Sequence, residues 1–306
     1  MELKDFDFSK ERSLSEFVQD YINLLKIIIT HFMGTLLQML VFPIGVMLLL
    51  GYFVSTKLNL NIDYTAQDFN ALMLVLLCAG GALMLVALLA FGFATEYFVL
   101  LRNSKSLNFT HRDVWQSFKR HSRQYLRFLL ASIGVCILIC IPVGIALFIS
   151  LFIPLIGFVL SGVSVALLEL WFFMAFMLYR EEEYRIGGSF KAAFNMVKNK
   201  MVDYGMAAFL VSFIFRILMS LIFILPSLIL WILSLNFLGM TEQFYETFSG
   251  HLVITFLSLM GTLFVIFSYI LSVICYGIIY EAAKELRFGD TIFDRIHAIG
   301  RRSSDV

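Results

Sequence analysis

Long, uninterrupted apolar runs dominate the pattern of hydrophobic and polar positions along this chain. A helix needs about 20 apolar residues to cross the roughly 30 Å hydrocarbon core of a bilayer, and six of the runs are that long. Each run is apolar all round rather than on one face, which is typical of a helix surrounded by lipid. The six predicted spans are Phe32–Val54, Leu72–Leu100, Phe128–Ser150, Leu155–Tyr179, Gly205–Ser234 and Leu252–Tyr280.

The amino-acid composition agrees with a chain that lies mostly in a membrane. Hydrophobic types make up 60% of the 306 residues and charged types 15%, whereas about a quarter of an average soluble domain is charged. We therefore predict an all-α fold, a polytopic bundle of six transmembrane helices with short amphipathic cytoplasmic helices. Residues 1–306 form one integral membrane domain, with segments 1–31 and 281–306 on either side of the spans at 32–280. No cleavable signal peptide is expected, because the N-terminal segment lacks a short apolar core.

The distribution of charge, rather than the net charge of +1, predicts the orientation of the chain. All but Lys57 and Arg216 of the 23 Lys and Arg residues lie before span one, between spans two and three or four and five, or after span six. Positive residues in short loops stay on the cytoplasmic side, so both termini should be cytoplasmic. Membrane topology explains the basic clusters, and we expect no nucleic-acid partner.

Each odd-numbered span is preceded by a short segment that begins like a helix. Ser13 with Glu16, and Thr110 with Asp113, fit the capping box, in which a hydroxyl and a carboxylate satisfy free backbone N–H groups. Each odd span also contains a proline, which lacks a backbone donor and is expected to kink the helix. These prolines are Pro43, Pro142 and Pro226. The pattern predicts three repeated helical hairpins, although any six-span protein has polar loops in which helices begin.

The segment before span three is both basic and aromatic. Lys and Arg in the headgroup layer meet anionic lipid, and the ring of Trp115 suits the same layer. We interpret this segment as an interfacial helix, although an ordinary positive-inside loop would also be basic. The residues expected to contact lipid headgroups are Arg112, Lys119, Arg120, Arg123 and Arg127.

Two segments, Thr110–Leu130 and Arg185–Phe209, each place a short basic amphipathic helix directly before a long span. In this layout the chain resembles bacterial multi-pass membrane families typified by the membrane domain of glycerophosphodiester phosphodiesterases. The resemblance implies a membrane- or lipid-linked role in the cytoplasmic (inner) membrane. It transfers no active-site residue, because we expect no phosphodiesterase catalytic domain among residues that are mostly spans.

Three ionisable residues interrupt the spans, where charged groups are costly and usually face the bundle interior. Glu169 lies 11 residues before Arg180, and Arg216 lies 11 residues after Gly205. At about 1.5 Å per residue, both sit roughly 16 Å from the cytoplasmic face, so we predict a midplane polar pair. If the two residues pair, they would act as a structural clamp that fixes helix register or as a polar site for a substrate headgroup or proton. The remaining alternative is that they do not touch. Glu96 lies nearer the interface and is expected to snorkel or to reach a lysine in a cytoplasmic helix.

Sequence motifs for catalysis or metal binding are absent. Cys136 and Cys140 are one helical turn apart, but no His or acid stands at a metal-site spacing, so we predict neither a metal nor another cofactor. The run Glu181–Glu183 is interpreted as a solvated helix end. No phosphate loop or nucleophile elbow occurs, and the sequence gives no basis for assigning an enzymatic activity.

Three functions remain. The first is a non-enzymatic protein that binds or organises lipid, or scaffolds a membrane complex, through basic interfacial helices. Its partners would be membrane lipid, anionic lipid included, and another membrane protein or a second copy. The alternative is a transporter or channel with a polar site at Glu169 and Arg216. An intramembrane enzyme acting on lipid, with Glu169 or Glu96 as acid or base, has the least support. A lateral opening toward lipid would favour the first function, and a water-filled path the second.

Overall fold

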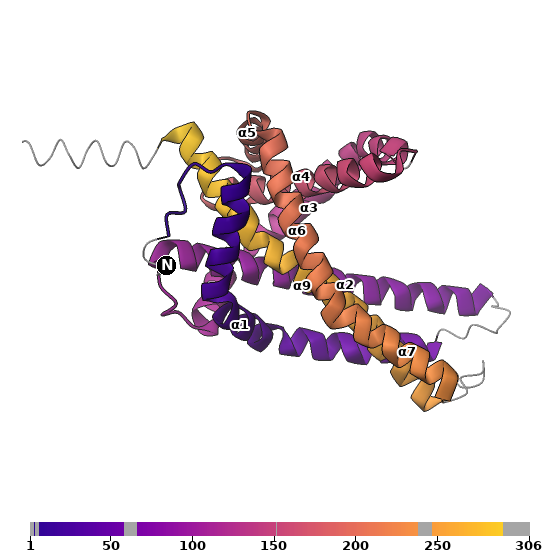
Figure 1. The fold of residues 1–306 in the computed structure, drawn as a ribbon. Coiled ribbons are helices and arrows are strands. Elements are labelled where there is room, and N and C mark those ends of the chain that lie inside the picture. Colours follow the sequence, from indigo (N-terminus) through magenta and orange to yellow (C-terminus); the bar gives the residue numbers. More distant parts are fainter. Residues whose placement is uncertain (1–2, 4–5, 58–65, 151, 238–246, 290–306) are drawn as a thin grey trace, which may run out of the picture. The chain divides into compact units, whose positions relative to one another are not determined.

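The structure is a computed structural model that describes residues 3, 6–57, 66–150, 152–237 and 247–289 (Figure 1). Its regular secondary structure is helical throughout these residues, which confirms the all-α prediction. The helices are α1 (Leu14–Lys57), α2 (Ala66–Ser104), α3 (His111–Ser150), α4 (Pro154–Arg180), α5 (Ile186–Lys198), α6 (Met201–Met219), the π-helical turn η2 (Ser220–Ile224), α7 (Leu225–Phe237) and α9 (Phe248–Phe288).

Six helices among the described residues are long and apolar enough to cross a membrane, which confirms the prediction of six spans. The fifth consists of α6, η2 and α7 in direct succession. Of the C-terminal segment 281–306, residues 290–306 lie outside the described part of the chain. The apolar stretches are Leu14–Thr56, Met73–Ser104, His111–Ile141, Gly157–Arg180, Met201–Ile229 and Phe248–Arg287.

Two segments expected as separate short helices are instead the first turns of long ones. α1 begins at Leu14 and α3 at His111, well before the apolar runs at Phe32 and Phe128. Neither intervening segment contains a glycine or proline, and helix propagation is favourable once a turn has formed. α5 is a separate short helix, as expected for the segment before span five.

At the two predicted helix starts, a carboxylate accepts a hydrogen bond from the backbone. The Glu16 carboxylate accepts a hydrogen bond from the Ser13 backbone N–H at 2.8 Å, and Asp113 accepts one from the Thr110 N–H at 2.7 Å. These bonds satisfy backbone donors that have no partner inside the helix. The start of α1 and the start of α3 are therefore fixed by local sequence.

The three prolines of the odd spans lie inside helical segments. Pro43 is in α1, Pro142 is in α3, and Pro226 is the second residue of α7, which begins where η2 ends. A proline ring clashes with the carbonyl four residues earlier, which for Pro226 is that of Ile222 inside η2. A π-helical turn shifts the hydrogen bonds to a wider spacing and makes room for the ring. Kinks at all three prolines remain predictions.

The chain divides into two compact units. The first unit comprises residues 1–32, 95–213 and 272–306, and the second comprises 33–94 and 214–271. In the first unit, α9 is buried at every residue from Ser272 to Tyr280. Gly277 lies in this stretch, and a Cβ atom there would come within 2.5 Å of the Phe98 ring. The glycine therefore lets α2 pack closely against α9.

Large apolar side chains remain exposed in both units. In the second unit, Phe42 is 79% exposed and Leu77 72%; in the first, Leu138 is 77% exposed. Soluble monomers rarely expose apolar areas of this extent. These surfaces fit contact with lipid chains, in agreement with the six spans.

Candidate functional site

The first turns of α3 have one buried face and one basic face. Val114, Phe118, Tyr125 and Phe128 are buried. At 3.6 residues per turn, these four point within about 80° of one another, and the five basic residues lie in an arc of about 100° on the opposite side. We call these exposed residues the basic face of α3: Arg112, Lys119, Arg120, Arg123 and Arg127.

The buried face of α3 packs on aromatic rings of α4 and α5. The centroids of the Tyr125 and Phe176 rings are 4.5 Å apart, and Phe128 stacks on Phe190 with centroids 5.2 Å apart. Trp115 remains 48% exposed beside the basic face. The packing fixes the rotation of α3 about its axis, so the basic face is held away from the protein.

Glu96 of α2 lies beneath this helix and is completely buried. The Arg180 guanidinium donates two hydrogen bonds to its carboxylate, from Nε at 2.8 Å and from Nη2 at 2.7 Å. Tyr125 and Ser117 donate from their hydroxyls at 3.0 and 2.5 Å. The expectation that Glu96 snorkels or meets a lysine was wrong, because a buried carboxylate needs a desolvated partner and the forked guanidinium supplies two donors.

This cluster joins three helices around one carboxylate. Glu96 comes from α2, Ser117 and Tyr125 from α3, and Arg180 from the end of α4. The Nδ1 atom of His121 on α3 lies 3.7 Å from Glu96. The sequence contained a signal for this arrangement, since Glu96 and Arg180 both stand near the predicted cytoplasmic ends of their spans.

A second ionic cluster surrounds Glu181, directly after α4. Its carboxylate accepts hydrogen bonds from Arg102 at 2.6 Å, from the Tyr280 hydroxyl at 2.7 Å and from Lys284 at 2.8 Å. Burial raises the pKa of Glu181. The opposite charges of Arg102 and Lys284 lower the pKa by more than burial raises it, so the pKa lies below its ordinary value of 4.5. For Glu181, the interpretation as a solvated helix end was therefore wrong. The cluster lines a polar cavity of about 420 Å³.

Glu169 takes part in a chain of hydroxyl groups inside the first unit. Tyr276 donates a hydrogen bond to its carboxylate at 2.6 Å, and the Tyr276 hydroxyl lies 3.3 Å from the hydroxyl of Ser212. Ser212 and Ser272 are hydrogen-bonded at 3.0 Å. Arg216 belongs to the second unit, and its pairing with Glu169 remains a prediction.

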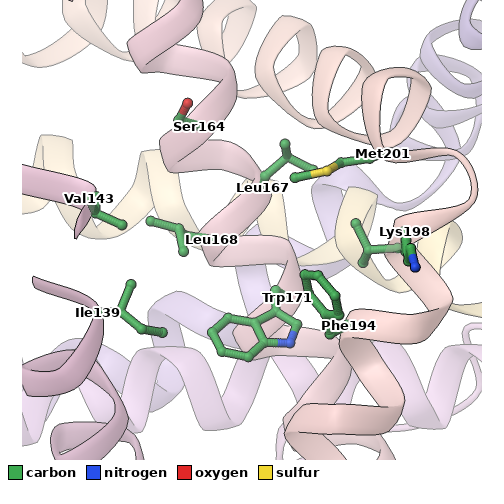
Figure 2. Close-up of a pocket in the computed structure, with 10 residues that line it drawn as sticks. Ile139, Val143, Ser164, Leu167, Leu168, Trp171, Phe194, Lys198 and Met201 are labelled. Atoms are coloured by element: carbon green, nitrogen blue, oxygen red, sulfur yellow. The ribbon is translucent and has the colours of Figure 1, made fainter. Parts of the chain in front are cut away.

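An apolar groove of about 400 Å³ runs over α3, α4 and α5 in the first unit and reaches the first residue of α6 (Figure 2). Leu168 points toward Ile139 and Val143, and Lys198 lies at one edge, near Phe194. Almost all of the lining is hydrocarbon or aromatic. We call this the α3–α5 groove, and its lining residues are Ile139, Val143, Ser164, Leu167, Leu168, Trp171, Phe194, Val197, Lys198 and Met201.

The polar groups of the groove are satisfied by the protein, except for one ammonium group. The Ser164 hydroxyl donates to the carbonyl of Leu160 at 2.8 Å, and the Trp171 indole N–H donates to the carbonyl of Phe190 at 2.9 Å. Lys198 has no acidic partner among the residues that the structure describes. Sequence reasoning did not single out this groove, because its walls come from apolar residues that look like any others in a span.

Within the described ranges, no group of three or more His, Cys, Asp or Glu residues could hold a metal ion. The four cysteines are free thiols, and Cys136 and Cys140 are exposed on α3. The chain matches no family model, no curated protein and no solved structure.

Proposed function

We propose that this integral membrane protein binds acidic lipid headgroups through the basic face of α3. The observation that carries the proposal is the exposure of five cations on the side of α3 opposite its buried aromatic face. α3 continues without a break into an apolar span, so its first turns stand where a helix leaves the membrane. Each Lys or Arg near an anionic surface contributes about 1 kcal/mol of attraction.

The proposal includes an orientation. Both termini and the basic face lie on the cytoplasmic side, which follows from the distribution of Lys and Arg. The layout that resembles the membrane domain of bacterial glycerophosphodiester phosphodiesterases supports a lipid-linked role in the cytoplasmic membrane. The α3–α5 groove, an opening with apolar walls beside the basic helix, favours lipid over an aqueous substrate.

Lipid analysis tests the proposal. The full chain is purified in a mild detergent, and its bound lipids are compared by mass spectrometry with those of the host membrane. The test variant carries Arg112→Gln, Lys119→Gln, Arg120→Gln and Arg123→Gln. The matched control loses four exposed cations from the same predicted side, by Lys26→Gln, Lys105→Gln, Arg185→Gln and Lys191→Gln.

We expect the wild-type chain and the control to be enriched in acidic lipid, and the test variant to lose the enrichment. Equal loss in both variants would show that total positive charge, and not the basic face, attracts the lipid. Bound lipid that matches the bulk membrane in the wild-type chain would contradict the proposal directly.

A transporter is the second candidate, and the polar chain around Glu169 favours it. A carboxylate followed by hydroxyls at hydrogen-bonding distance, on α4, α6 and α9, is an arrangement through which protons can pass in a membrane. Proteoliposomes loaded with a pH-sensitive dye would show proton uptake under an imposed gradient. Uptake that Glu169→Gln abolishes would support this function, and no uptake above that of empty liposomes would exclude proton movement through the chain.

A further inference from the structure

We infer that the α3–α5 groove binds one acyl chain of an acidic phospholipid, with Lys198 contacting the headgroup phosphate. This inference rests on the proposed lipid-binding function, but it uses a different set of residues from the basic face of α3. The basic face would attract acidic headgroups to the cytoplasmic surface. The groove would hold a single lipid at a defined place.

The walls of the groove are suited to a hydrocarbon chain. Ile139, Leu168 and Val143 form apolar surface on both sides. The two polar side chains inside it, Ser164 and Trp171, already donate to backbone carbonyls. The hydrogens of both groups are therefore already used, so a ligand meets no free donor on these walls, and burying a polar ligand there would cost hydrogen bonds that it made with water.

The charge at the edge of the groove selects the headgroup. Lys198 ends α5, the ammonium group is exposed, and no carboxylate among the described residues pairs with it. The lining contains no Asp or Glu. A phosphate can meet Lys198, but the amine of a zwitterionic headgroup would find no counter-charge in the groove. An acidic phospholipid is therefore favoured over a zwitterionic one.

The size and position of the groove fit one chain of the cytoplasmic leaflet. Its volume of about 400 Å³ lies in the range of roughly 300–1,000 Å³ that is usual for sites that bind small molecules. Trp171 and Ser164 are seven residues apart on α4, which is about 10 Å along the helix. One leaflet of the hydrocarbon core is about 15 Å thick, so the groove accommodates much of one chain.

Fluorescence quenching by brominated lipids tests the inference, because Trp171 is part of the lining. Trp115→Phe and Trp231→Phe leave Trp171 as the sole tryptophan of the full chain. This variant is reconstituted into phosphatidylcholine vesicles that contain increasing fractions of phosphatidylglycerol with dibrominated acyl chains. A second series uses dibrominated phosphatidylcholine in the same proportions.

We expect the brominated acidic lipid to reach half-maximal quenching at a mole fraction about fivefold lower than brominated phosphatidylcholine, as one lysine near an anionic headgroup would give. Lys198→Gln should remove this difference. Lys191→Gln, which changes an exposed lysine of α5 outside the lining, should keep it. Ser164→Phe should weaken quenching by filling the groove, whereas Ser161→Phe, outside the lining, should not.

Equal quenching by the two lipids, unchanged by Ser164→Phe, would overturn the inference, because Trp171 would then meet only bulk lipid. Absence of quenching by either lipid would also overturn it, since something other than lipid would fill the groove. The basic face is tested separately by the lipid analysis of its four-residue variant. If the four-residue variant loses its acidic-lipid enrichment but the two lipids quench Trp171 equally, the proposed function is retained and lipid binding in the groove is rejected. If that variant keeps its enrichment but the acidic lipid quenches Trp171 at the lower mole fraction, the groove is retained and the basic face is rejected.

Discussion

The Arg180 guanidinium donates two hydrogen bonds to the Glu96 carboxylate, at 2.8 and 2.7 Å, and thereby ties the end of α4 to α2. Both side chains are buried, with Glu96 fully inaccessible and Arg180 9% exposed. The same carboxylate holds Tyr125 and Ser117 of α3. The ion pair therefore also holds α3, the helix that carries the basic face, although the cation of the pair comes from α4.

Breaking this pair should destabilise the protein strongly. Arg180→Gln leaves the Glu96 carboxylate buried without its counter-charge, and removing one partner of a buried pair costs about 3–5 kcal/mol. We expect a marked fall in the thermal unfolding temperature of the purified protein in detergent. Replacing both residues together, by Glu96→Leu and Arg180→Leu, should cost less than Arg180→Gln. Glu182→Gln, at an exposed position next to the cluster, serves as the control, and a loss there as large as that of Arg180→Gln would argue against a special role for the pair.

Gly277 should not tolerate a side chain. The Cβ of Gly277→Ala would lie within 2.5 Å of the Phe98 ring, and overpacking of this kind typically costs about 1–3 kcal/mol. Gly261→Ala makes the same change in the same helix, where a Cβ would meet nothing within 4 Å, and it should be neutral or stabilising. Thermal unfolding of both variants measures the difference. Phe98→Leu removes the ring and should restore the unfolding temperature of Gly277→Ala. If it does not, the Cβ clashes with a group other than Phe98.

Glu181 should make stability depend on acid pH. Although burial raises its pKa, Arg102 and Lys284 bring it below the ordinary value of 4.5 in the folded protein. The carboxylate therefore contributes stability that is present above pH 4.5 and is lost as pH falls through the lower folded-state pKa. The unfolding temperature of the wild-type chain should exceed that of Glu181→Gln at neutral pH, and the gap should close on acidification below pH 4.5. A gap that stays constant would mean that Glu181 contributes through packing rather than charge.

Labelling of single cysteines should report the orientation. In a variant with all four natural cysteines replaced by serine or alanine, Thr56→Cys at the end of α1 is expected to react with a membrane-impermeant maleimide in intact cells. Lys105→Cys, in the loop between α2 and α3, should react only after permeabilisation, because the distribution of Lys and Arg predicts a cytoplasmic position for that loop. Labelling of Lys105→Cys in intact cells would reverse the predicted topology.

The sequence by itself determined the six spans of this protein and the starts of two helices. Long apolar runs locate the six spans, since the thickness of a bilayer sets the length of helix that must be apolar. Local hydrogen bonds of Glu16 and Asp113 mark the starts of α1 and α3, because each carboxylate acts on a backbone group three residues away. Such features depend on neighbours in the chain, so they can be predicted without knowledge of the packing.

Only the tertiary structure decided which residues meet. Glu96 and Arg180 are 84 residues apart in the chain, and their contact depends on the rotation of α2 and α4 about their axes. An apolar run is equally apolar in every rotation, so it does not state which face a neighbouring helix will cover. The α3–α5 groove depends on the same choice, because Trp171 and Leu168 line it only where α3 and α5 leave one side of α4 open.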